Sequence, residues 1–199
     1  MSRLVNEAAR VGLALGAVVL VLSGSVHAHP GHDVVGGGFG AGLTHPLFGL
    51  DHLVAMMAIG VWSLNQRPTC RSVIPLLAAC GMLLGAVVTW GGLLLPGIEF
   101  GIVMSVLLMG MLVTTLFRAP TVLGAPMVVL FLFFHGQAHG AEMPAGIAPL
   151  AYLTGFTVAT LLIIYTARWV GQRLMSHDKR LVQLLGAIIT TSGALLAIS

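Results

Sequence analysis

Charged side chains are scarce in this 199-residue chain: they make up 8% of it, whereas hydrophobic residues make up 57%. This balance excludes an ordinary soluble protein and predicts a single integral membrane domain that lies in a lipid bilayer. The formal net charge of +3 is small, and basic loop residues that orient a membrane chain account for it. Nucleic-acid binding is therefore not expected.

Cysteines and nucleotide-binding motifs are also rare or missing. The two cysteines, Cys70 and Cys80, form neither a disulfide framework nor a zinc-ligand pair, so we expect free thiols. The chain has no phosphate-binding loop of the GxxxxGK[ST] type and no HExxH metalloprotease motif. The chain is therefore not expected to hydrolyse ATP itself.

The N-terminus has the features of an export signal. Arg3 and Arg10 precede the apolar run 11–22, and Val26 and Ala28 then stand at the small-residue positions of a secretory cleavage site. We predict a cleavable signal peptide over residues 1–28. An uncleaved membrane helix is the alternative, but the apolar run is short for a span that needs about 20 residues. Export places the mature N-terminus outside the cytoplasm of a bacterial-type cell.

A Gly-rich leader over residues 29–41 follows, and it carries His29, His32 and Asp33. Neutral imidazole is the commonest protein ligand for metal ions, so these three residues form a weaker candidate metal site. A solvated leader in which the histidines are incidental is the alternative.

The remainder, residues 42–199, contains six apolar segments that are each near the length needed to cross a bilayer. The predicted fold is therefore all-α, a polytopic six-helix transmembrane bundle. Short connections make successive helices antiparallel neighbours. The expected segments are 42–64, 73–95, 98–117, 122–140, 148–169 and 181–198.

The basic residues orient this bundle. With the mature N-terminus outside, every Lys and Arg beyond the signal region falls on the cytoplasmic side, as the positive-inside rule requires. We therefore expect a multi-pass protein of the bacterial inner membrane with both mature termini in the periplasm. These residues are Arg67, Arg71, Arg118, Arg168, Arg173, Lys179 and Arg180.

Ionisable residues at membrane depth are costly, at roughly 2.5–3.5 kcal/mol for a charged side chain by insertion scales, and they usually serve function. His135, His139 and Glu142 have this position near the end of the fourth segment. At 3.6 residues per turn they project from one helical face within an arc of about 60°. Two imidazoles and a carboxylate thus converge on one point.

The first segment carries a second group, His45, Asp51 and His52. His45 and His52 share a helical face, whereas Pro46 fits a helix start and would leave His45 just outside the regular turn. Asp51 fits two roles, a direct metal ligand or an acceptor that orients an imidazole N–H. Both groups fall in the outer half of the membrane, so they can form one site if the two helices are in contact.

Other residues of these segments have plainer interpretations. Glu99, near the outer end of the third segment, is expected to be simply solvated. The glycine pairs Gly136/Gly140 and Gly81/Gly85 each have the spacing that allows close helix contacts.

These motifs resemble the HupE/UreJ family of nickel permeases. The family has a histidine, five residues and then Asp-His in the first mature helix, and Phe-His-Gly-x-Ala-His-Gly-x-Glu in the fourth. This chain matches both, from His45 to His52 and from Phe134 to Glu142. The resemblance implies uptake of nickel, with cobalt as a second substrate, to supply metalloenzymes such as hydrogenase or urease.

The residues themselves agree with that implication. Imidazole suits borderline divalent cations such as nickel, and carboxylates offset their charge, but affinity order alone does not separate nickel from cobalt, zinc or copper.

Because both motifs lie on the same side of the midplane, an outward-facing selectivity site fits better than a symmetric alternating-access centre. We expect no enzyme activity and no resident cofactor. An intramembrane metal-dependent hydrolase and a metal sensor or chaperone are the alternative functions.

Overall fold

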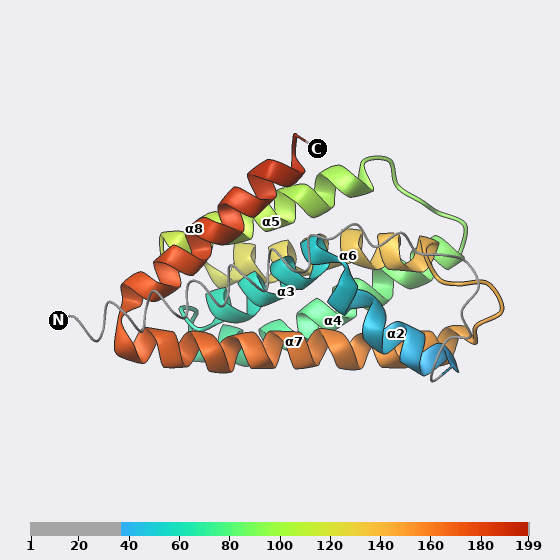
Figure 1. The fold of residues 1–199 in the computed structure, drawn as a ribbon, viewed down its shortest axis with the longest axis horizontal. Helices are drawn as coiled ribbons and strands as arrows, with labels where there is room; N and C mark the ends of the chain where they lie inside the picture. The colour runs from blue at the N-terminus through green and yellow to red at the C-terminus, as the bar shows by residue number, and fades with distance from the viewer. Residues whose placement is uncertain (1–36, 199) are drawn as a thin grey trace. The chain divides into compact units, whose positions relative to one another are not determined.

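Seven α-helices account for most of the chain in a computed structural model that describes residues 37–198 (Figure 1). The all-α prediction is confirmed, and no strand occurs in that range. Six segments are present when α2 and α3 are counted as one. The helices are α2 (Gly37–Phe48), α3 (Leu50–Ser63), α4 (Pro68–Trp90), α5 (Ile98–Thr114), α6 (Thr121–Ala141), α7 (Pro149–His177) and α8 (Lys179–Leu196).

The first expected segment is not one straight helix. It starts at Gly37 rather than at residue 42, passes through Pro46, and breaks at Gly49, where α2 and α3 meet at an angle of 80°. The prediction that Pro46 starts a helix was wrong, because the first turns form upstream of it. The bend means that His45 and His52 do not share one helical face. Discontinuous helices of this kind are typical of transporter binding sites.

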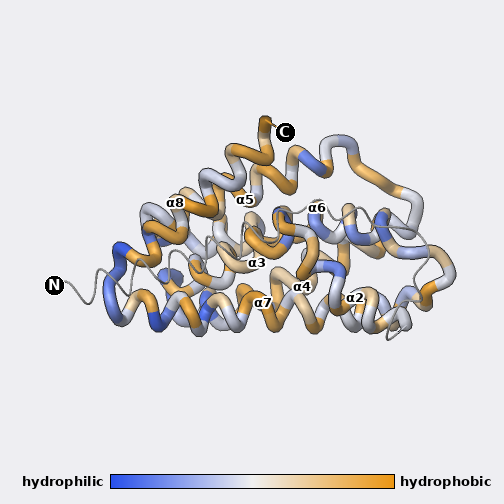
Figure 2. The backbone as a smooth tube through the Cα atoms, viewed as in Figure 1, coloured by the Kyte–Doolittle hydropathy of each residue, from blue (hydrophilic) through white to orange (hydrophobic). Residues whose placement is uncertain are grey.

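Three helices, α4, α6 and α7, are long and apolar enough to cross a membrane, and the bent pair α2–α3 would make a fourth span. At 17 residues, α5 is a shorter apolar helix. Helix α7 extends beyond the expected end at residue 169 to His177. Figure 2 shows hydrophilic residues gathered where α7 turns into α8 and hydrophobic residues along the helices. The chain is therefore a membrane protein.

Glycines bring the helices into close contact. In α6, a Cβ added at Gly136 would strike the carbonyl oxygen of Met82 in α4. One added at Gly85 in α4 would strike that of Phe133 in α6. The predicted role of these glycines in packing is confirmed, because only glycine allows the two backbones to approach so closely. Glycines also line the contacts of α2 with α7 and of α5 with α8.

Hydrogen bonds link the loop after α3 to the loop after α5, and both loops carry basic residues. The indole Nε1 of Trp62 donates to the carbonyl of Phe117 at 3.0 Å, and Asn65 Nδ2 donates to the carbonyl of Leu116. Arg118 Nε donates to the carbonyl of Asn65 at 2.9 Å. The loop after α3 and the loop after α5 are therefore on the same side of the bundle.

Candidate metal-binding site

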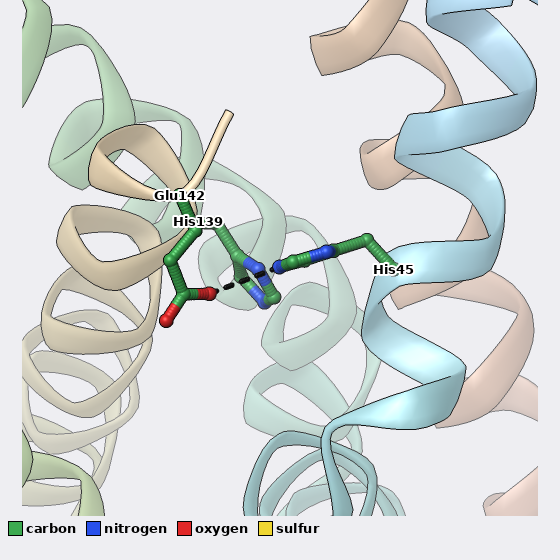
Figure 3. Close-up of side chains that lie close together, drawn as sticks. All are labelled: His45, His139 and Glu142. Carbon is green, nitrogen blue, oxygen red and sulfur yellow. Dashed lines mark hydrogen bonds and ion pairs between the residues drawn. The ribbon is translucent and has the colours of Figure 1, made fainter. Parts of the chain in front are cut away.

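The carboxyl ends of α2 and α6 meet at one point. His45 lies in the last turn of α2, His139 lies in the last turn of α6, and Glu142 caps α6 immediately after its end. The Nε2 atom of His45 is 3.0 Å from Oε2 of Glu142, and the rings of His45 and His139 are 4.7 Å apart between centroids. Figure 3 shows these three side chains converging from the two helices.

These three residues form a candidate outer cluster. One ligand atom from each lies within 4.8 Å of the other two. Two imidazole nitrogens and a carboxylate oxygen suit a borderline divalent cation. Because α2 and α6 both end here, the negative ends of two helix dipoles also favour a cation. A cation bound between His45 and Glu142 would replace the hydrogen bond that links their side chains.

Exposure falls across the outer cluster from Glu142 to His139. The side chain of Glu142 is 57% exposed and that of His45 is 32% exposed, whereas His139 is buried. The hydrogen bond from His45 lowers the pKa of Glu142, although partial burial acts in the opposite direction. Glu142 is therefore anionic at neutral pH, at the water-facing edge of the cluster.

The cluster continues into the protein through a chain of imidazoles. The ring of His139 lies 4.1 Å from that of His52, and the ring of His52 lies 4.6 Å from that of His135, between centroids. His52, His135 and His139 are all buried. The structure thus brings both predicted groups together, and His139 is in contact with His45 as well as with His52.

Asp51 joins this chain through His52. Its Oδ1 atom accepts hydrogen bonds from the backbone N–H of His52 at 2.8 Å and from His52 Nδ1 at 2.6 Å. Asp51 lies in the first turn of α3, directly after the break at Gly49, where a Cβ would come within 3.1 Å of His52 Nδ1. Of the two roles considered for Asp51, this geometry matches the acceptor that orients an imidazole.

Several imidazole nitrogens have no hydrogen-bond partner. Among the described residues, the buried unpaired side-chain atoms are His52 Nε2, His135 Nδ1, both ring nitrogens of His139, and Gln66 Oε1. Buried polar groups are nearly always paired, because an unpaired one loses its hydration without compensation. Four such nitrogens on three neighbouring rings indicate a place for a cation or for water.

A cavity of about 400 Å³ opens beside the imidazole chain. Its polar lining comes from Asp51, His52, Glu142 and Glu99. Glu99 was expected to be simply solvated, and its shared cavity with the site could not be inferred because its helix, α5, carries neither motif. The carboxylates make this cavity attractive to cations.

Two further residues support the site and were missed from the sequence. Ser105 of α5 is buried, with Oγ 2.8 Å from Nε2 of His135. Gln137 stands at the first of the two variable positions of the fourth-segment motif. Its Nε2 donates to the carbonyl of Leu93 at 2.9 Å, and its Oε1 accepts from the backbone N–H of Leu95. It anchors the loop between α4 and α5. Nothing in the sequence distinguishes either residue, because positions two apart on a helix do not share a face and Ser105 lies in a helix without a motif.

The weaker candidates His29, His32 and Asp33 lie outside the described residues, as does the predicted signal peptide. Their assignment remains a prediction.

Known proteins resemble this chain in sequence. The chain is 35% identical over 144 residues to Protein HupE of Rhizobium leguminosarum bv. viciae, which covers 72% of this chain and 74% of that protein. No solved structure matches the chain. Residues 17–196 match the HupE / UreJ protein family, and the chain therefore belongs to the HupE/UreJ family.

Proposed function

We propose that this protein is a permease of the bacterial inner membrane that takes up divalent transition-metal ions, nickel foremost and cobalt second, to supply metalloenzymes such as hydrogenase or urease. The observation that carries the proposal is the chain of imidazoles from His45, which is partly exposed, to His135, which is buried. Neighbouring ligands of one chemical type allow a cation to exchange one nitrogen for the next without meeting bare hydrocarbon.

In this proposal, the carboxylates of Glu142, Asp51 and Glu99 draw the hydrated cation to the cavity from the periplasmic side. The outer cluster of His45, His139 and Glu142 then exchanges water for nitrogen and oxygen ligands. The membrane potential favours inward movement by about 2.3 kcal/mol per elementary charge per 100 mV. A divalent cation gains twice that amount, so no nucleotide hydrolysis is needed.

The hydrolase alternative gains no support from this arrangement. Its general base would be Glu142, but that carboxylate is hydrogen-bonded to His45, itself a candidate ligand. A base that activates metal-bound water must be free to accept its proton. Transport therefore accounts for the geometry better than hydrolysis does.

The test is uptake of radioactive nickel by liposomes that contain the purified protein, with an inside-negative potential. We expect time-dependent accumulation that exceeds that of empty liposomes and falls when an ionophore abolishes the potential. Competition by cobalt, zinc and copper would rank the substrates. Binding of nickel without accumulation would contradict the permease proposal and favour a sensor or chaperone.

A further inference from the structure

The hydroxyl of Ser105 lies between a carbonyl oxygen and an imidazole nitrogen. Its Oγ lies 2.6 Å from the carbonyl oxygen of Ile102, one turn earlier in α5, and 2.8 Å from His135 Nε2. A carbonyl oxygen can only accept, so the contact with Ile102 requires the single hydroxyl proton of Ser105. The serine oxygen then has only lone pairs for His135, and Nε2 of His135 must carry the imidazole proton.

This assignment fixes the other nitrogen of the ring. In a neutral imidazole with a proton on Nε2, the Nδ1 atom has a free lone pair. His135 Nδ1 is buried and has no hydrogen-bond partner. It is therefore an unused acceptor in the interior of the protein.

His52, whose ring is next to that of His135, is fixed in the opposite sense. Its Nδ1 atom is 2.6 Å from Asp51 Oδ1, and since a carboxylate only accepts, Nδ1 carries the proton. The lone pair is then on Nε2, which is likewise buried and unpaired. The two rings are 4.6 Å apart between centroids and nearly perpendicular. Two neighbouring imidazoles thus each keep a free lone pair and offer no donor to the other. A cation bound between the rings would satisfy both.

We infer that Ser105 is a positioning residue for metal transfer: it holds His135 in the Nε2–H tautomer, so that His135 Nδ1 and His52 Nε2 form an inner station for the cation. The inference rests on the proposed function and adds a third helix, α5, to the site. The inner station lies beyond the outer cluster, and His139 connects the two because its ring contacts both His45 and His52. Hydrogen-bond partners that orient metal-binding histidines are typically worth 10–100-fold in metal affinity.

Three variants of the full-length protein test the inference. Ser105→Ala removes the hydroxyl, and we expect nickel affinity, measured by equilibrium binding to purified protein, to fall by about tenfold or more. Ser105→Thr keeps the hydroxyl, so its nickel affinity should stay within about threefold of wild type. That change is smaller than the loss expected for Ser105→Ala. Ser63→Ala is the matched control, because Ser63 is a buried serine whose Oγ donates to a carbonyl three residues earlier, also at 2.6 Å, without an imidazole partner. It should bind nickel as wild type does.

The tautomer is measured directly by ¹⁵N NMR of protein with labelled histidine and no metal, with the His135 signals assigned by their loss in His135→Ala. We expect a protonated Nε2 and an unprotonated Nδ1 in wild type, and a mixture of tautomers in Ser105→Ala. A protonated Nδ1 in wild type, or a folded Ser105→Ala that binds nickel as wild type does, would overturn the inference. Neither the tautomer nor the equilibrium affinity depends on transport, so failure of transport with the expected tautomer and affinities would contradict only the proposed function.

Discussion

His45 Nε2 and Glu142 Oε2 lie 3.0 Å apart although 97 positions separate them in the chain. Their contact joins the end of α2 to the end of α6, and His139 lies against the same imidazole. The contact thereby brings residues of both sequence motifs together in the outer cluster. The residues around this contact can be tested one at a time.

The negative charge of Glu142 is expected to contribute to nickel binding. Glu142→Gln keeps the size of the side chain and a hydrogen-bonding group for His45 but removes the negative charge from the outer cluster. Nickel affinity should fall by about tenfold or more, because even groups that only orient metal ligands contribute that much. Glu142→Asp, which keeps the charge on a shorter side chain, should lie between Gln and wild type in the same equilibrium binding assay. Equal affinity of the Gln variant and wild type would remove Glu142 from the site.

Glu99 should act by attraction at a distance. In Glu99→Gln, one carboxylate of the 400 Å³ cavity is lost, so we expect slower nickel uptake at low nickel concentration and normal uptake at saturation. The difference should shrink as salt is raised, because ions screen the field of an exposed carboxylate. Initial uptake rates over a range of nickel and salt concentrations provide the measurement. A loss at saturating nickel that salt does not alter would indicate a direct ligand instead.

The glycine contact between α4 and α6 should set the stability of the bundle. Gly136→Ala would drive a methyl group into the backbone of Met82, and overpacking of this kind typically costs about 1–3 kcal/mol. Gly171→Ala is the control, because its added methyl would meet only the side-chain ends of Leu64 and Val61, which can turn aside. Thermal unfolding in detergent should show a lower Tm for Gly136→Ala and little change for Gly171→Ala. Two equal Tm values would show that the close approach is not needed.

The orientation can be tested with reporter fusions. Arg118 is hydrogen-bonded to the loop that follows α3, so two of the basic connections share one side of the bundle, and we expect that side to face the cytoplasm. Alkaline phosphatase, which is active only after export, should be active when fused after residue 199 and inactive when fused in the loop near Arg118. The reverse pattern would turn the site toward the cytoplasm and contradict uptake through the outer cluster.

The candidate ligands could be predicted from the sequence more readily than their arrangement. The spacing of His135, His139 and Glu142 is a local helical property, and the cost of ionisable groups in a membrane identified them. The helix break at Gly49 could not be predicted from the sequence, because Pro46 suggested a helix start and the apolar run continues through the bend. Helix α7 is in contact with both α2 and α3, and such tertiary contacts are not visible in the local sequence.

The supporting residues were the least predictable. Ser105 and Glu99 lie in α5, a helix without any motif, and their roles depend on which helices surround the imidazoles. A buried serine that hydrogen-bonds its own helix is common in apolar segments. Only the position of His135 beside Ser105 distinguishes it from Ser63, and that position is a property of the three-dimensional structure.

The central claim is that a cation binds among the imidazoles that His139 connects. X-ray absorption at the nickel edge of the nickel-loaded protein, wild type against His139→Ala, measures this most directly. We predict a shell of nitrogen and oxygen ligands with imidazole scattering in wild type, and a weaker imidazole contribution or no bound nickel in the variant. Sulfur ligation in wild type, or the same spectrum and nickel content in both proteins, would contradict the account.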